Sequence, residues 1–346
     1  MAELADAPDL GSGGQPCRFK SCYPQEGASA PFFVDFFPGI CYTFQRQKQS
    51  DRKDINNMKK GIAALVGAAV AASALFTACS LPTSVTDYLF PDEKDYTEYA
   101  GEKIEIENDE VLSLDLDWVA GEIEIRDGEK ITVTEENLKG TYYPLYYTVK
   151  DGALYVKFCK SGTLGRVIDG CSKKVIVTLP EGMKEIRVNS VSATIGINYE
   201  KDIEKVTVNT VSGDFGAGLE TVGSITADAV SANMDIFAIS AEKVVANSVS
   251  GDTEINGSPK EIEAHSVSGG FTVYAGGPYT NSVRIDTISG DAKITIDGRR
   301  CYSLDYNTVS GKLKNEVGEV KDKTREELVI KVDSVSGNLN IVNNQD

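Results

Sequence analysis

The chain has 346 residues, of which 41% are apolar and 25% charged, so a sizeable core is possible and a wholly disordered protein is excluded. Asp and Glu (52) outnumber Lys and Arg (35), which gives a formal net charge of −17. Phosphate backbones repel such a polyanion, so we expect no nucleic-acid partner. His265 is the single histidine, which excludes histidine-rich metal sites and any Ser-His-Asp triad that does not pass through it.

Residues 58–78 have the pattern of a bacterial lipoprotein signal peptide. Met58 is followed by two lysines, an uncharged run at 61–76, and small residues before Cys79. The run is shorter than the roughly 20 residues of a membrane-spanning helix. The ending FTAC resembles a lipobox, with Phe where Leu is commoner, and predicts lipid attachment at Cys79. An uncleaved anchor helix is the alternative.

A signal peptide that begins at residue 58 predicts that translation starts at Met58. Residues 1–57 show no apolar periodicity, and their three cysteines lack metal-site spacing. The opening MAELADAPDLGSGGQPCRFKSCYP resembles the peptide obtained when a transfer-RNA gene is translated. We therefore expect 1–57 to be a disordered start-site artefact, with a genuine cytoplasmic extension as the alternative. Residues 79–101 are polar and acidic, which predicts a tether between the membrane and the domain.

From residue 102 onward, apolar and polar residues alternate with a period of two, as in Ile123/Ile125 and Val175/Val177. Gly and Asp-Gly pairs separate the runs, which is typical of short strands joined by turns. No segment of the exported chain has a 3.6-residue period, so we expect a smaller all-β region at 102–182. Cys159 and Cys171 flank the loop KSGTLGRVIDG in this region. The sequence is compatible with a disulfide between them and with two separate thiols.

Eight copies of a repeat with a Val-Ser-Gly core occupy residues 183–346. Their serines stand at 192, 212, 231, 250, 268, 289, 310 and 336, and DWVAGEIEI from Asp117 is a weaker, earlier copy. Counting the repeat Val (Ile in one copy) as position 0, residues at −5, −3, 0, +2, +4 and +6 have the parity of strand residues that face a core. Polar residues at −2 and −1 predict a bend between two strands. Gly or Ala at +2 predicts space for the facing strand, and the parity places Val249 inside and Ser250 outside.

Two strands and a bend in about 20 residues, repeated eight times, predict an all-β fold, a single-stranded parallel β-solenoid or β-helix. Each coil pairs with the next at about 4.8 Å. No coil buries its apolar face alone, so the stack supplies the core.

The segments WVAGEIEI (118–125) and KVIVTLPEG (174–182) and the serial Val-Ser-Gly units resemble the bacterial "putative adhesin" family of β-strand-repeat proteins, a domain of unknown function. The resemblance covers residues 112–342, most of the exported chain. It implies an exported or envelope-associated protein with a surface role, and it names no ligand.

The Ser at +1 and the polar residue at +3 predict an outward ladder of hydroxyl and carboxylate groups: Ser212, Asp214, Ser250, Asp252, Ser289 and Asp291. The ladder has three interpretations: turn residues that satisfy the backbone, a surface for a glycan, a peptidoglycan strand or a surface protein, or oxygen ligands for Ca²⁺. His265 stands at a bend position that is Asn or Asp in the other copies, which indicates a turn residue. Trp118 and the tyrosines at 142, 143, 146 and 147 are core residues or a platform for sugars.

Phosphate-binding loops, calcium repeats and a local cluster of unusual residues are all absent from the sequence, so we predict no catalytic residue, no metal site and no cofactor. The leading hypothesis is a non-enzymatic adhesin or surface-binding scaffold, lipid-anchored to a membrane of the bacterial cell envelope and extracytoplasmic. An accessory or sensor protein of an envelope-stress system is the first alternative, and a carbohydrate-active β-helix enzyme is the second.

Cys79→Ala should release the exported protein from the membrane, because each buried CH₂ of the acyl chains contributes about 0.8 kcal/mol to anchoring. Detergent phase partition of wild type and variant measures this, with only the wild type expected in the detergent phase. If both proteins enter the detergent phase equally, lipidation at Cys79 is wrong.

Overall fold

The computed structural model describes residues 96–101, 103–107, 110–160, 170–277, 279–297, 300–317 and 327–344. Within these residues the chain is all-β, with 19 strands that are hydrogen-bonded into one sheet system. The predicted signal peptide, Cys79 and most of the tether lie outside the described residues. In the described segments, no helix has the length and apolar character needed to cross a membrane.

The strands before the Val-Ser-Gly repeats are β1 (Thr97–Glu98), β2 (Ile104–Ile106), β3 (Ser113–Asp127), β4 (Ile131–Lys139), β5 (Tyr146–Lys150), β6 (Ala153–Lys157) and β7 (Ser172–Leu179). The strands of the repeats are β8 (Glu185–Tyr199), β9 (Ile203–Thr210), β10 (Phe215–Ala229), β11 (Met234–Ser248), β12 (Thr253–Ser266), β13 (Phe271–Tyr274), β14 (Ser282–Thr287), β15 (Ala292–Ile296), β16 (Tyr302–Thr308), β17 (Leu313–Asn315), β18 (Leu328–Ser334) and β19 (Leu339–Asn343).

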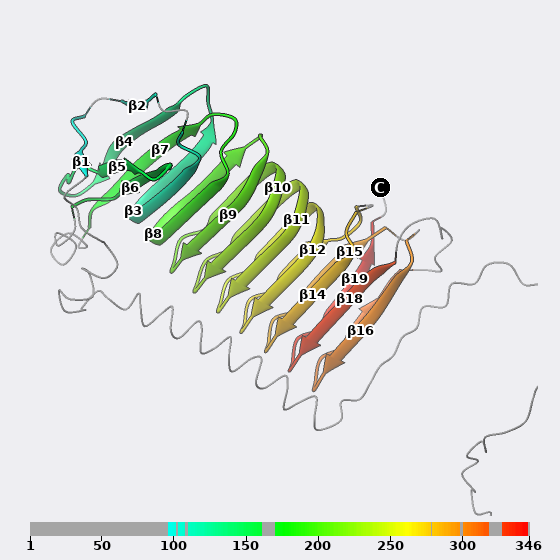
Figure 1. Ribbon diagram of the computed structural model, residues 1–346. Helices are drawn as coiled ribbons and strands as arrows, with labels where there is room; N and C mark the ends of the chain where they lie inside the picture. The colour runs from blue at the N-terminus through cyan, green and yellow to red at the C-terminus, as the bar shows by residue number, and fades with distance from the viewer. Residues whose placement is uncertain are drawn as a thin grey trace, which may run out of the picture. The chain divides into compact units, whose positions relative to one another are not determined.

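Each coil has two strand segments: an entry arm that leads into the Val-Ser-Gly bend and an exit arm that follows it. Entry arms of adjacent coils pair in parallel and in register, so that Val244 lies between Ile225 and Ile262. Exit arms do the same, and Ile236 lies between Ala217 and Ile255. The entry arms therefore form one parallel sheet and the exit arms a second, as the stacked arrows show (Figure 1). The prediction of a parallel β-solenoid is confirmed.

The core lies between these two sheets and follows the predicted parity on both arms, except next to the bend. Val244 and Ala246, at −5 and −3, are fully buried, as is Ile255 at +6. The prediction that position 0 faces the core is wrong, because Val249 is only half-buried and Val309 is 62% exposed. The entry arm continues through the expected bend to −1. The polar residue at −1, such as Ser248 or Ser266, therefore faces inward and is buried.

This inward Ser or Thr at −1 closes the bend by accepting a hydrogen bond from the backbone N–H at +2. The distances are 2.7 Å from Gly269 N to Ser266 Oγ and 2.9 Å from Gly290 N to Thr287 Oγ1. A short hydroxyl that bonds its own backbone is a common way to stabilise a turn. A bend is therefore present, but it follows the predicted residues at −2 and −1, which end the entry strand.

The polar residues at −2 form a ladder between coils and do not bond their own bend. Asn209 Nδ2 donates to Asn189 Oδ1 at 2.9 Å, and Asn247 Nδ2 donates to Asp228 Oδ1 at 2.6 Å. His265 occupies the same row, with Nδ1 3.1 Å from Asp286 Oδ2. Such contacts add side-chain hydrogen bonds to the backbone pairing of adjacent coils.

Where +2 is glycine, the backbones of adjacent coils approach one another too closely for a side chain, whereas Ala193 and Ala232 fill this position in two other coils. A Cβ added to Gly269 or Gly290 would lie 1.9 Å from the carbonyl oxygen of the equivalent glycine in the neighbouring coil. The expectation that +2 leaves room for the facing strand is therefore wrong. At Gly269 and Gly290 the backbone of the preceding coil occupies this space.

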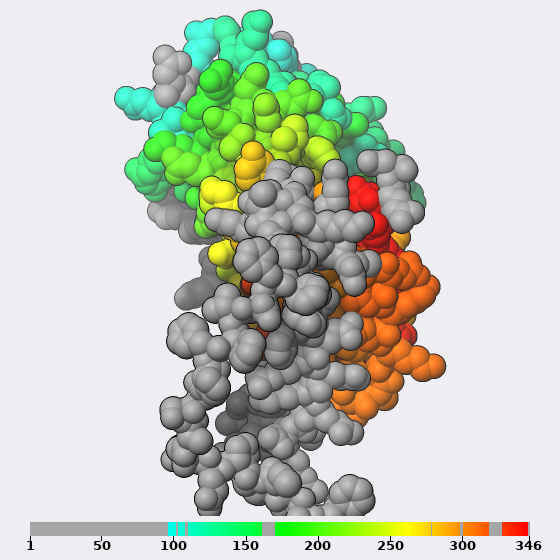
Figure 2. Space-filling model, turned by 90° about the vertical axis from the view of Figure 1, so that its right-hand side faces the viewer, coloured from blue at the N-terminus to red at the C-terminus, as the bar shows by residue number. Residues whose placement is uncertain are grey.

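The order of coils in space departs from their order in sequence at the C-terminal end. The last repeat, β18 and β19, pairs with β14 and β15 on one side and with β16 and β17 on the other. The final repeat is thus inserted between the sixth and seventh repeats, and β16 forms the end of the stack (Figure 1). The orange residues of this end coil face the viewer in the space-filling view (Figure 2).

The N-terminal end shows a similar rearrangement and an antiparallel cap. β3 pairs in parallel with β8 on one side and with β6 and β7 on the other, so the weaker copy at Asp117 is a full coil. The parallel stack therefore extends N-terminal of residue 183. β4 and β5 then pair antiparallel to β7 and β6, and β2 and β1 add to them.

Gly290→Ala should lower the free energy of unfolding by about 1–3 kcal/mol, because the new Cβ forces two backbones apart. Gly216→Ala on β10 is the matched control, since a Cβ added to Gly216 would meet no other atom within 4 Å. In a strand the control change should be neutral or stabilising by up to about 1 kcal/mol. Urea denaturation of both variants measures this, and equal losses would contradict the close approach at +2.

Candidate functional site

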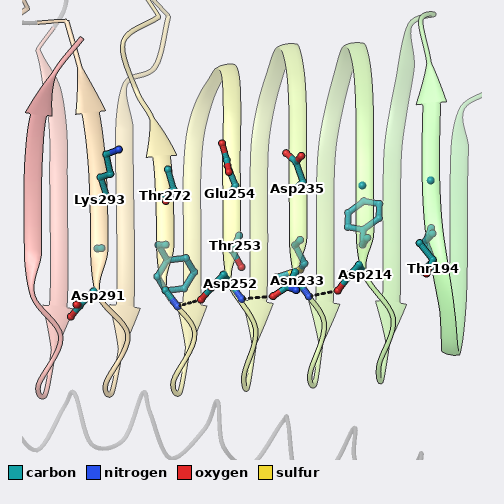
Figure 3. Close-up of a pocket in the computed structure, with 18 of the residues that line it drawn as sticks. Thr194, Asp214, Asn233, Asp235, Asp252, Thr253, Glu254, Thr272, Asp291 and Lys293 are labelled. Carbon is teal, nitrogen blue, oxygen red and sulfur yellow. Dashed lines mark hydrogen bonds between the residues drawn. The ribbon is translucent and has the colours of Figure 1, made fainter. Parts of the chain in front are cut away.

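A groove of about 970 Å³ crosses the exit arms of successive coils on the outer face of their sheet. Its lining begins at Lys174 of β7 and continues to Asn338 and Asn340 at β19. The close-up shows its polar residues at equivalent places on adjacent strands (Figure 3). Because the strands run across it, the groove follows the stacking axis of the solenoid.

Two rows of outward side chains line the groove, one at +3 and one at +5. The +3 row contains Thr194, Asp214, Asn233, Asp252, Gly270, Asp291 and Asn338. The +5 row contains Gly196, Gly216, Asp235, Glu254, Thr272, Lys293 and Asn340. Both rows follow from the period of two, since alternate residues of an exit arm point to the same face.

The +3 row is itself a hydrogen-bonded ladder between coils. Asp214 Oδ1 accepts from the backbone N–H of Asn233 at 3.1 Å, and Asp252 Oδ1 accepts from the backbone N–H of Gly270 at 2.9 Å (Figure 3). Asn233 Oδ1 does the same for Asp252 N at 3.0 Å. Because Asn233 accepts the same bond as Asp214 and Asp252, the ladder depends on an acceptor oxygen and does not need a charge.

The predicted serines lie beside this ladder, at the bend. Ser212, Ser250 and Ser289 donate to backbone carbonyls of the preceding coil, at 3.3, 3.5 and 3.2 Å. Asp214, Asp252 and Asp291 line the groove, but the three serines are outside its lining. The structure thus brings together the predicted carboxylates and gives the predicted hydroxyls backbone partners.

Sequence reasoning missed the +5 row, which contributes Asp235, Glu254 and Lys293. The signal was present, because continuing the period of two from +3 gives +5 and +7 on the same outer face. These positions vary in residue type from coil to coil, so the repeat itself does not mark them.

In the described part of the chain, four carboxylates in the middle of the groove have no ion-pair partner. Within the described residues, no Lys or Arg forms an ion pair with Asp214, Asp235, Asp252 or Asp291. At the N-terminal end of the groove, by contrast, Lys174 pairs with Glu122 at 3.3 Å and with Glu124 at 3.0 Å. Hydrogen bonds to Glu124 and Glu122 raise the pKa of Lys174.

The outer face of the entry sheet is different, because its charges pair across coils. Lys205 lies 3.3 Å from Glu185, and Lys243 lies 2.9 Å from Glu263. The two outer faces of the solenoid therefore differ: one carries cross-coil ion pairs, and the other carries a groove with unpaired carboxylates.

Trp118 is a core residue, so the sugar platform that the sequence left open for it is wrong. It is 2% exposed, packs edge-to-face on Phe158 at 4.9 Å, and donates from Nε1 to Lys173 O at 3.2 Å. The Lys173 ammonium is buried beside it and pairs with Glu135 at 2.8 Å. Burial lowers the pKa of Lys173, against the opposing effect of Glu135.

Cys159 and Cys171 lie on either side of the loop at 161–169, which is outside the described residues. Both are buried thiols, and both interact electrostatically with Lys173. The disulfide between them stays a prediction. Among described side chains, no group of three or more His, Cys, Asp or Glu is placed to hold a metal ion.

Residues 102–342 match the Toastrack DUF4097 family. Three solved structures are similar: a "putative cell adhesion protein" from Clostridium sporogenes (13% identity, 72% of this chain and 99% of that chain, TM-score 0.24), a "putative adhesin" from Bacteroides fragilis (12%, 71% and 97%, 0.40) and a "putative adhesin" from Parabacteroides merdae (13%, 72% and 97%, 0.30). These likenesses are too weak to carry an argument about function. Among curated proteins, none matches this chain.

Asp252→Ala should lower the free energy of unfolding by about 1 kcal/mol, because Gly270 N–H loses its acceptor. Asp252→Asn should be near neutral, since Asn233 already accepts the equivalent bond one coil away. Chemical denaturation of the two variants measures the difference. An Asn variant as unstable as the Ala variant would mean that the fold needs the charge of Asp252.

Proposed function

The chain belongs to the Toastrack DUF4097 family, and on the geometry of its groove we propose that it is a non-enzymatic adhesin or binding scaffold of the bacterial cell envelope. In this proposal a lipid at Cys79 holds the protein on an extracytoplasmic membrane surface. The groove on the exit sheet binds a linear, repetitive polymer, namely a glycan such as a peptidoglycan strand.

The observation that carries the proposal is the direction of the groove. It follows the stacking axis, and each coil adds another pair of outward positions at about 4.8 Å from the last. A linear polymer laid along this axis meets chemically similar groups again and again. Weak contacts of this kind add through effective concentration, so affinity does not require a deep pocket.

The difference between the two outer faces supports the exit sheet as the binding face. Carboxylates without neutralising partners repel one another and so oppose folding slightly. The +3 ladder needs only an acceptor oxygen, which Asn233 supplies without a charge. The fold therefore does not require the negative charge of Asp214, Asp252 and Asp291. Ligand binding is a role that uses this charge.

A carboxyl whose pKa is strongly raised lies away from the groove. Burial, and then the negative charge of Asp117, raise the pKa of Asp115 to about 6. Strongly shifted groups mark catalytic sites when they sit in a cleft. Asp115 and Asp117 stand instead on the entry arm of β3, outside the residues that line the groove.

A graded series of variants tests the proposal, with Asp→Asn changes chosen because they keep the acceptor oxygen of the ladder. Asp252→Asn alone should weaken binding a few-fold, and the triple change of Asp214, Asp252 and Asp291 to Asn should abolish it. The probes are peptidoglycan sacculi in a pull-down and a glycan array. The matched control changes Glu185, Glu261 and Glu263 of the entry face to Gln and should leave binding intact.

Two results would contradict the proposal. Complete loss from Asp252→Asn alone would indicate a single pocket, as in an enzyme, and turnover of the glycan would then be expected. The second is unchanged binding in the triple variant, or no binding by the wild type. The +3 ladder would then serve only to stabilise the turns.

A further inference from the structure

One aromatic side chain interrupts the polar surface beside the groove. Phe237 of β11 is 46% exposed, and Ile239, two residues further along the strand, is 57% exposed. Phe237 stands at +7, so it has the same outward parity as the groove rows at +3 and +5. Its register partners on the adjacent coils are Gly218 and Asn256, neither of which has an apolar side chain.

The strand neighbours of Phe237 offer it no apolar partner. Gly218 has no side chain, and a Cβ there would lie 2.9 Å from the carboxamide oxygen of Asn198. On the other side, Asn256 Nδ2 donates to Glu254 Oε1 at 2.8 Å. Phe237 is therefore an apolar surface set between two amide groups.

The same strand supplies carboxylates next to this surface. Asp235 precedes Phe237 by two residues on the same face, and its register partner is Glu254. Both carboxylates line the groove, and the close-up labels both in the +5 row (Figure 3). Phe237 itself is outside the groove lining, but on its strand it is two residues from Asp235, which lines the groove.

A pyranose ring has the matching chemistry. Its C–H face is apolar and slightly positive, which suits the negative face of an aromatic ring, and its edge carries hydroxyls that donate to carboxylates. From this geometry we infer that Phe237 is the stacking platform for one sugar ring of the polymer in the groove. The inference rests on the proposed function and adds a specialised subsite to an otherwise regular surface.

The charge of the subsite selects the class of sugar. Asp235 and Glu254 repel a uronic acid and favour a neutral or amino-bearing sugar, because like charges brought together cost affinity. The glycan that binds is therefore a linear polymer of neutral or amino-bearing hexoses.

The test measures binding of the full chain to an array of neutral, amino-bearing and uronic-acid oligosaccharides. Phe237→Ala should weaken binding to the neutral or amino-bearing set by about tenfold or more, as expected for an aromatic anchor, whereas Phe237→Tyr should stay within a few-fold. Tyr279→Ala is the matched control, because Tyr279 is 66% exposed but lies between β13 and β14, away from the strand that carries Phe237 and Asp235. It should leave binding unchanged.

A spectroscopic readout is independent of affinity. The chain has a single tryptophan, Trp118, which is 2% exposed, so Phe237→Trp adds an exposed reporter. Its emission should shift to the blue when the bound oligosaccharide is added, as the indole leaves water.

The outcomes separate this inference from the proposed function. Binding that is lost in the triple Asp→Asn variant but kept in Phe237→Ala overturns the subsite alone. Selective binding of uronic-acid oligosaccharides also overturns it. No binding to any oligosaccharide overturns both the subsite and the proposed function.

Discussion

The close approach of adjacent backbones at position +2, which is glycine in all but two of the eight repeats, is the constraint on which the rest of this solenoid depends. Where Gly290 meets Gly269, there is no room for a Cβ, so the coils can pair in register on both arms. In-register pairing places equivalent residues side by side, which aligns the apolar positions into one core and the polar ones into ladders. The groove is a consequence, because it consists of the outward +3 and +5 positions of exit arms held in that register.

Much of this architecture could be predicted from the sequence, because a repeat of about 20 residues with strand parity specifies the coil. The prediction that position 0 faces the core failed for a physical reason. The inward place is taken by the residue before it, such as Ser266, which accepts a hydrogen bond from Gly269 N. Hydropathy does not distinguish such a buried serine from an exposed one. The insertion of β18 between β14 and β16 was also not predicted. The interfaces between coils have similar chemistry, so the sequence does not favour one spatial order of the coils over another. The long interval before Ser336 was the only signal there. At the site, Asp214, Asp252 and Asp291 were found because they belong to the repeat, and Phe237 was missed because it occurs once.

The site combines regularity with one exception. The +3 ladder is built into the fold, since each side chain holds the N–H of the next coil, and Asn233 shows that the fold does not need its charge. The charges of Asp214, Asp252 and Asp291 can therefore be used for a ligand without loss of the ladder. The proposed subsite at Phe237 differs from the regular rows of the groove. It would fix the position of the polymer along the stacking axis. Ion pairs such as Lys243–Glu263 leave the opposite face with little free charge.

The central claim is that the ligand lies along the stacking axis and contacts several coils at once. Affinity of the full chain for oligosaccharides of increasing length, taken from the class that binds on the array, tests this most directly. Affinity should rise with each added sugar while the oligosaccharide extends over further coils, and then level off when the groove is filled. Affinity that is already maximal for a mono- or disaccharide would contradict it, because a single pocket would then contain the whole site.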